Sequence, residues 1–328
     1  MYSQGYSDNN GSNALIKIAL PAVVLFQVVT CFFIPTNYER AGEWIPLFSG
    51  FWDMDIVMTA GMKSIIYGIA SAVLLLLSLY ILNDKLFSSI SKSFTTVAVA
   101  ATLIFCDPMA VYFTSIYPAA ICIVWSLYCL LTAQIFLAFF LISLASMFFA
   151  PLILTIPVVM IITLIVGSDS LRIFLKSIGG TLVPIIYVLS FRYLEFNDVG
   201  VFCSQFAEQL TAVNFEFFSK HLADLFMILC IMIVSLHAII RTLIEQGHNN
   251  IAEANGLRLA ILSAVLSAAV YFLYSGAGNI PVGILIAPML AVILSNFFTS
   301  GYKEQSVRIE IIILLCSFIV ARLGFFIS

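Results

Sequence analysis

A pair of aspartates in the first sixth of the chain is the first candidate for chemistry. The segment Trp52-Asp53-Met54-Asp55 comes just before a long apolar run. Carboxylate oxygens are preferred ligands of Mg²⁺ and Mn²⁺, so Asp53 and Asp55 can hold such an ion, which would in turn bridge phosphates. One of the two can instead act as a general base toward a sugar hydroxyl. The structural alternative is that both carboxylates cap a helix that begins near Ile56.

Four other charged residues are expected on the same side of the membrane as these aspartates. Lys63 is predicted about two turns into the following apolar run, where it contacts a lipid-linked phosphate or Asp55, or extends to the lipid headgroups. Asp107 either contributes a third carboxylate to the site or caps a loop. Arg40 and Arg192 are the remaining basic residues predicted near a substrate phosphate, although Arg40 follows Glu39 and is also typical of a solvated loop.

A histidine inside an apolar run is a further candidate. His237 and Arg241 are four residues apart and share one face of the expected helix. A histidine in a membrane suggests a proton relay, but this run has acidic residues only at its two ends, which favours a structural, hydrogen-bonded histidine. Of the charged residues, only Lys63, and Glu310 near the end of its run, lie plainly within the apolar runs. This scarcity argues against an ion-coupled pump, because such pumps need carboxylates inside the membrane.

The composition decides the class of protein that must position these residues. Apolar residues make up 62% of the 328 residues, charged residues make up 9%, and the mean hydropathy is +1.11. A soluble domain needs about a quarter charged residues to cover its surface. The chain is therefore expected to be an all-α, polytopic integral membrane protein. A soluble enzyme, a nucleic-acid-binding module and a secreted disulfide scaffold are excluded, and the seven cysteines form no Cys-x-x-Cys pair.

Eleven apolar runs predict membrane spans, for which about 20 residues are typical and about 17 are a practical minimum. The shortest of the predicted spans, with 16 or 17 residues, fall at or just under that limit. The predicted spans are 14–34, 57–82, 94–113, 117–133, 135–150, 151–166, 171–191, 224–244, 257–274, 281–298 and 308–326.

The distribution of basic residues predicts the orientation of these spans. With eleven spans and a cytoplasmic N-terminus, nine lysines and arginines face the cytoplasm, whereas ten spans would move six of them outside. We therefore expect a disordered cytoplasmic tail at 1–13 and a single transmembrane domain at 14–328. Its C-terminus is external, as are the two larger loops, 35–56 and 192–221.

Small residues and prolines punctuate the middle of the chain. The stretch 114–166 can hold two long helices or three short ones, and the breaks at Thr132-Ala133-Gln134 and Ala150-Pro151 favour three. Further along, Gly179-Gly180 predicts close packing against another helix, and Pro184 predicts a kink.

Both external loops carry an amphipathic pattern. Trp44, Phe48, Phe51 and Trp52 share one face of a short helix, which is typical of a helix lying flat among lipid headgroups. The later loop has the same kind of stripe, and its helix either lies on the outer leaflet or packs against the bundle. That stripe consists of Phe202, Phe206, Leu210, Val213 and Phe217.

Two resemblances extend this reading. The segment 140–193, with Ala150-Pro151, a basic turn from Arg172 to Lys176 and the Gly179-to-Pro184 helix, resembles the middle of an uncharacterised family of Bacteroidota inner-membrane proteins. That family implies no activity. The cytoplasmic N-terminus, the flat aromatic helix and Asp53-Met54-Asp55 are similar to GT-C-type glycosyltransferases. This second resemblance implies a polyprenyl-phosphate-linked sugar as substrate, although the chain is short for that class and lacks an external soluble domain.

Three hypotheses of function follow. The first is an inner-membrane enzyme of envelope-glycan assembly that uses Asp53 or Asp55 as metal ligand or base, with Mg²⁺ or Mn²⁺ as the expected cofactor. The second is a transporter or lipid flippase with Gln27, His237 and Asn296 around a midplane cavity. The third is a non-catalytic subunit or scaffold whose partners are other membrane subunits. All three expect the lipid bilayer as a partner and none expects nucleic acid.

Overall fold

The structure is a computed structural model that describes residues 10–31, 62–86, 90–166, 169–213, 222–245, 251–274, 281–299 and 304–327. Within these ranges the secondary structure is helical, which confirms the all-α prediction. The α-helices are α1 Asn10–Cys31, α3 Met62–Leu86, α4 Ile90–Ile104, α5 Ile116–Leu131, α6 Ile135–Phe148, α7 Thr155–Val166, α8 Ser170–Phe191, α9 Val199–Thr211, α10 Leu222–Glu245, α11 Ile251–Tyr274, α12 Gly283–Thr299 and α13 Glu304–Ile327. Two 3₁₀ segments, η1 Pro108–Val111 and η2 Ala150–Leu154, and a π-helical turn, η3 Arg192–Phe196, complete the described elements.

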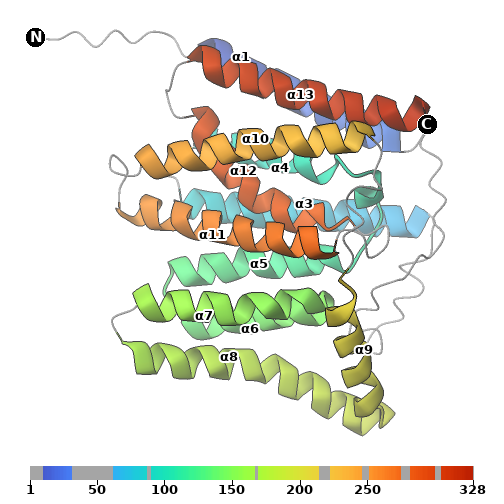
Figure 1. The fold of residues 1–328 in the computed structure, drawn as a ribbon, viewed down its shortest axis with the longest axis vertical. Helices are drawn as coiled ribbons and strands as arrows, with labels where there is room; N and C mark the ends of the chain where they lie inside the picture. Colours follow the sequence, from blue (N-terminus) through green and yellow to red (C-terminus); the bar gives the residue numbers. More distant parts are fainter. Residues whose placement is uncertain are drawn as a thin grey trace, which may run out of the picture.

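The long helices lie side by side, and successive helices run in opposite directions (Figure 1). We call the end of the bundle where α1 begins the N-end, and the end where α13 finishes the C-end. Lys92 near the start of α4 bonds to residues near the start of α11 and the end of α12 at the N-end. Arg322, near the end of α13, bonds to the carbonyl of Gln27 at the C-end. The first and last described helices, α1 and α13, are therefore parallel.

Four of the described helices are long and apolar enough to cross a membrane by length and composition: Lys63–Leu86, Ser170–Phe196, Leu222–Ile244 and Glu253–Tyr274. Six further apolar helices are shorter, among them α5, α6 and α12. At 1.5 Å per residue, the 14 residues of α6 extend only about 21 Å. The helical membrane character predicted from composition is thus present in the structure.

Three helices, and not two, occupy the stretch 114–166, as the sequence favoured. Ala133, with a φ of 59°, adopts the left-handed conformation between α5 and α6. Pro151 lies in the first turn of η2, where its missing N–H costs no helical hydrogen bond. These two local features end α5 and α6 where the chain must reverse.

Several predicted boundaries differ from the structure by four residues or more, and two of them have a local explanation. The run expected as one span over 94–113 is α-helical only to Ile104, and η1 follows after a short break. Pro108 explains the break, because its ring disfavours helical geometry at Asp107 and removes a backbone donor. At the N-terminus α1 begins at Asn10, four residues earlier than the predicted tail boundary. The polar run Asn10 to Asn13 extends the helix beyond its apolar part.

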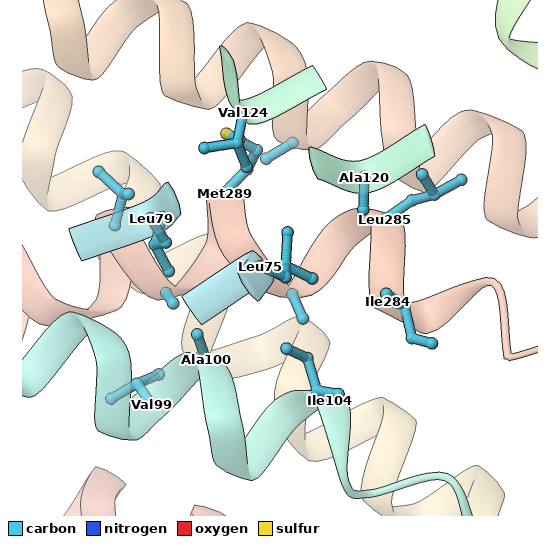
Figure 2. Close-up of a cluster of buried hydrophobic side chains, with 14 of the residues drawn as sticks. Leu75, Leu79, Val99, Ala100, Ile104, Ala120, Val124, Ile284, Leu285 and Met289 are labelled. Carbon is cyan, nitrogen blue, oxygen red and sulfur yellow. The ribbon is translucent and has the colours of Figure 1, made fainter. Parts of the chain in front are cut away.

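The core is built around α12, which is buried along most of its length. It packs against α3, α4, α5, α10 and α11. Figure 2 shows Ile284 and Met289 of α12 in one apolar cluster with side chains of three neighbouring helices: Leu75 and Leu79 of α3, Ile104 of α4 and Val124 of α5. The outer helices instead expose large apolar side chains, such as Leu74, Leu175, Ile186, Ile233 and Leu236. An apolar rim around an apolar core is what a bilayer, as solvent, requires.

Close helix packing at the glycine pair is confirmed. A Cβ atom added to Gly180 would lie 2.3 Å from the carbonyl oxygen of Phe136 in α6. Next to it, the hydroxyl of Ser143 donates to the carbonyl of Thr181 at 2.8 Å. The absence of a side chain therefore lets α8 and α6 approach backbone to backbone. Gly68 does the same for α3 against η1, where an added Cβ would lie 2.1 Å from the carbonyl oxygen of Val111.

The amphipathic helix predicted in the later loop is α9, which lies across the C-end of its neighbours (Figure 1). Its Phe202 is buried against Met147 and Val188, and Phe206 packs beside it. The apolar stripe thus packs against the bundle, the second of the two alternatives. Val213 at its end is exposed, and Phe217 lies outside the described residues, as does the aromatic helix expected before Asp53.

The position of α9 makes a test of orientation possible. Cys203 is exposed on α9, whereas Cys106, Cys129 and Cys230 are buried. If the C-end is external, a membrane-impermeant maleimide added to intact spheroplasts should label Cys203 in a variant that retains it as its single cysteine. Protection in spheroplasts together with labelling in inverted vesicles would reverse the orientation. The cysteine-free protein is the control for background labelling.

Candidate functional site

The aspartate site expected before the second span falls mostly outside the residues that the structure describes. Asp53, Asp55 and Arg40 lie outside them. Lys63 is the second residue of α3 and its side chain is exposed at the C-end. Over the described part of the chain, no three His, Cys, Asp or Glu side chains come together as a metal site. The predicted Mg²⁺ or Mn²⁺ centre therefore stays a prediction.

The other two predicted substrate contacts have local structural roles. The carboxylate of Asp107 accepts a hydrogen bond from the backbone N–H of Met109 at 2.9 Å and caps η1, as the loop-capping alternative proposed. Arg192 is buried at the end of α8, where Nη1 pairs with Oδ2 of Asp198 at 3.1 Å. Its guanidinium also lies over the rings of Phe196 and Phe202, at 5.3 and 5.6 Å from their centroids. Arg192 thus joins α8 to α9.

A histidine–carboxylate pair joins α10 to α13 inside the bundle. Nδ1 of His237 lies 2.7 Å from Oε1 of Glu310, and Nε of Arg241 donates to Nε2 of the same ring at 3.3 Å. Counted at 1.5 Å per residue, His237 is about 12 Å from the end of α10 and Glu310 about 9 Å from the start of α13. Both therefore lie well inside their helices, toward the N-end.

The surroundings of this pair are apolar on one side and polar on the other. The ring of His237 meets the edge of Phe297 in α12, with centroids 5.3 Å apart. Glu310 is the more enclosed partner, with 14% of its side chain exposed against 35% for His237. Its Oε2 atom is buried and has no hydrogen-bond partner among the described residues. A buried carboxylate oxygen in this state retains an unused acceptor position for a hydrogen bond.

A second polar group lies on the other side of the same end of α12. Nζ of Lys92 pairs with Oε1 of Glu253 at 3.1 Å and donates to Oδ1 of Asn296 at 3.4 Å. One turn further into α4, Thr96 donates to the hydroxyl of Ser295 at 2.5 Å. Because Asn296 and Phe297 are consecutive, the end of α12 separates the two polar groups. Together they form what we call the N-end polar layer: Lys92, Glu253, Asn296, His237, Arg241 and Glu310.

A buried arginine holds the opposite end together. Arg322 in α13 is only 1% exposed, and its Nη2 donates to the carbonyl oxygen of Phe105 at 2.5 Å and to that of Gln27 at 3.5 Å. Gln27 in turn contacts Sγ of Cys106 at 3.5 Å. Of the three residues expected to line a transport cavity, Gln27 is thus at the C-end, whereas His237 and Asn296 belong to the N-end polar layer.

The sequence pointed to His237 but not to its partner. Glu310 is 73 residues away in the chain, and Glu253 is 161 residues from Lys92. The available signal was that Glu310 is a carboxylate inside an apolar run, which predicts a functional or paired residue by default. No protein-family model, curated protein or solved structure matches this chain.

Proposed function

We propose that the chain is a multi-pass inner-membrane protein with eleven spans and a cytoplasmic N-end. The helices other than α9 supply these passes, and the parallel arrangement of α1 and α13 supports an odd number. The basic side chains support the orientation, because cytoplasmic ends carry the excess of lysine and arginine. Seven described ones lie toward the N-end, namely Lys85, Lys92, Arg172, Lys176, Arg241, Arg258 and Arg308, against Lys63, Arg192 and Arg322 toward the C-end.

For the activity, we propose proton-coupled transport, with the His237–Glu310 pair as the proton-binding site. The observation that carries this proposal is the 2.7 Å contact between an imidazole and a carboxylate within two helices of the bundle. The sequence argued against an ion-coupled pump because few charged residues lie within the spans, and it favoured a structural role for His237 because that run has acidic residues only at its ends. Glu310 supplies an acidic partner from α13.

The physics of the bilayer favours a working role for such a pair. A charged side chain near the bilayer centre costs about 2.5–3.5 kcal/mol on insertion scales, so ionisable residues persist there mainly where they are paired or needed. Histidine ordinarily gains its proton between about pH 5 and pH 8, the range across which a proton gradient acts. A pair that joins two helices also couples proton binding to their relative position.

Proton binding can be measured without knowledge of the transported substrate. The protein is reconstituted in liposomes on a solid-supported membrane and given a jump in external pH. We expect a transient charge displacement in the wild type, and we expect Glu310→Gln to reduce it to the level of protein-free liposomes. His237→Asn should reduce it as well, because the pair acts as a unit.

Glu208→Gln is the matched control, because Glu208 is an exposed carboxylate on α9 away from this pair. This variant should keep the wild-type displacement. Equal displacement in wild type and Glu310→Gln would overturn the assignment of the proton site. A scaffold without transport activity would show no displacement in any variant.

Transfer of lipid-linked sugars is the second candidate function. It is favoured by the position of α9, which lies across the C-end (Figure 1), the end of the bundle at which α3 begins and which carries Lys63. Its reacting groups are Asp53 and Asp55, with Lys63 at the donor phosphate. If it is correct, Asp53→Asn combined with Asp55→Asn abolishes the envelope glycan, whereas Glu310→Gln leaves the glycan unchanged.

A further inference from the structure

The hydrogen bonds around His237 define which of its nitrogens carries the proton. Arginine has no acceptor atom and does not deprotonate in proteins, so its Nε–H is necessarily the donor. The bond from Arg241 at 3.3 Å therefore requires an unprotonated Nε2 on His237. The hydrogen of the neutral ring then resides on Nδ1, which donates to Oε1 of Glu310 at 2.7 Å. The imidazole is neutral in this arrangement and both of its nitrogens are engaged.

This geometry limits where an additional proton can go. Protonation of Nε2 would break its bond to Arg241 and place two cations beside each other. Oε2 of Glu310, in contrast, is buried without a hydrogen-bond partner among the described residues and can take a proton with no bond broken. Oε2 is therefore the position at which a proton can be added while the bond between Arg241 and His237 is kept.

The neighbouring helices add few competing charges. Helix α10 packs against α12 and α13, and α12 contains no titratable side chain. On α13 the charged neighbour of Glu310 is Arg308, two residues earlier. Helix α1 packs against α13, and its described side chains, residues 18–30, carry no charge. Among the described side chains of α10, α12 and α13, the charged groups toward the N-end are Arg241, Arg308 and Glu310, and the Lys92–Glu253 pair lies on the other side of the end of α12.

From these contacts we infer that Arg241 is a positioning residue that occupies Nε2 of His237 and so directs the proton to Oε2 of Glu310. This inference rests on the proposed proton site. The step is a simple transfer: a hydronium ion from the aqueous side of the N-end loses one O–H bond and becomes water, and its proton forms an O–H bond on Oε2, which neutralises the negative charge of Glu310. His237 keeps its single proton on Nδ1 throughout.

Two spectroscopic measurements on the full-length protein test this inference. For nitrogen NMR, ¹⁵N-labelled histidine is introduced in a background with His221→Asn and His248→Asn, which leaves His237 as the only histidine. For infrared difference spectroscopy, the carboxylic-acid carbonyl band is followed. Both are recorded between about pH 8 and about pH 5, where histidine ordinarily ionises.

In wild type we expect a neutral His237 with the proton on Nδ1 at both pH values, and a carboxylic-acid band that grows on acidification and is absent in Glu310→Gln. In Arg241→Met the additional proton taken up on acidification should bind Nε2 of His237 instead of Glu310. Imidazolium signals should then replace the carboxylic-acid band. Arg241→Lys, which retains a cationic donor, should restore the wild-type pattern at least in part.

An imidazolium signal from His237 in acidified wild type overturns the inference, and this readout needs no variant to fold. An Arg241→Met protein that behaves as wild type overturns it as well. The spectra and the pH-jump measurement test different claims. If the spectra agree with expectation but the pH jump displaces no charge, the proton site exists but does not drive transport. If the pH jump displaces charge but the spectra contradict expectation, proton-coupled transport remains supported and the role of Arg241 is wrong.

Discussion

Replacement of Gly180 by alanine should destabilise the protein by about 1–3 kcal/mol, the usual range for overpacking a tight interface. The added Cβ atom would lie 2.3 Å from the carbonyl oxygen of Phe136 and 3.1 Å from Cβ of Phe139. The first of these contacts is with backbone, so no side chain can rotate away to relieve it. The helices α6 and α8 must separate, and the bond from Ser143 to Thr181 lengthens with them.

The neighbouring residue provides a matched control for this prediction. Gly179→Ala gains the same helix propensity, about 0.5–1 kcal/mol, but its Cβ meets only the ring of Phe136, at 3.4 Å. Thermal unfolding of the detergent-solubilised protein, followed by fluorescence-detected size exclusion, compares the two variants. We expect Gly180→Ala to unfold at a lower temperature than wild type and Gly179→Ala at or above it. Equal unfolding temperatures for Gly180→Ala and Gly179→Ala would mean that α6 and α8 do not approach each other closely at Gly180.

Removal of the Arg322 guanidinium should cost about 2–4 kcal/mol. Arg322 is 1% exposed and donates to the carbonyl of Phe105. Phe105 is the residue directly after Ile104, the last residue of α4. The last carbonyls of a helix have no partner within it, and a cation beside them also interacts favourably with the helix dipole. A hydrogen bond to a charged group contributes about 1.5–3 kcal/mol, and Arg322→Met loses this together with the link to Gln27.

Arg172→Met serves as the control for Arg322→Met, because Arg172 is exposed near the start of α8. We expect this control to unfold within a degree or two of wild type, as surface substitutions usually change stability by less than about 0.5 kcal/mol. Arg322→Lys should fall between the two, since it keeps the charge but loses the planar fork of donors. Wild-type stability of Arg322→Met would show that the carbonyls at the C-end do not depend on this side chain.

Much of the fold could be predicted because a bilayer makes strong demands on local sequence. Every span must satisfy its backbone hydrogen bonds within its own helix and present apolar side chains to lipid. The positions of the helices can therefore be predicted from runs of apolar residues that are adjacent in the chain. The breaks at Ala133 and Pro151 were equally local, and both occur as expected. The error at Ile104 arose because the hydropathy of residues 105–113 outweighed Pro108 in the prediction.

Only part of the candidate site could be predicted from local sequence in the same way. His237 and Arg241 are one helical turn apart, so their contact follows from helix geometry. The contact of His237 with Glu310 depends on which face of α13 meets α10, and apolar faces in a membrane do not reveal their partners. The Arg192–Asp198 pair, six residues apart, could have been found from the local sequence but was read as a substrate contact instead.

By itself the sequence determined that this chain is a helical membrane protein, where its helices lie and which ionisable residues fall inside them. These properties depend on composition and on short-range periodicity, which the solvent selects directly. Only the tertiary structure decided that α12 forms the centre, that Gly180 is a point of backbone contact and that Glu310 meets His237. Those pairings join residues far apart in the chain, and they are set by the packing of helix faces whose apolar side chains are alike in sequence but differ in shape.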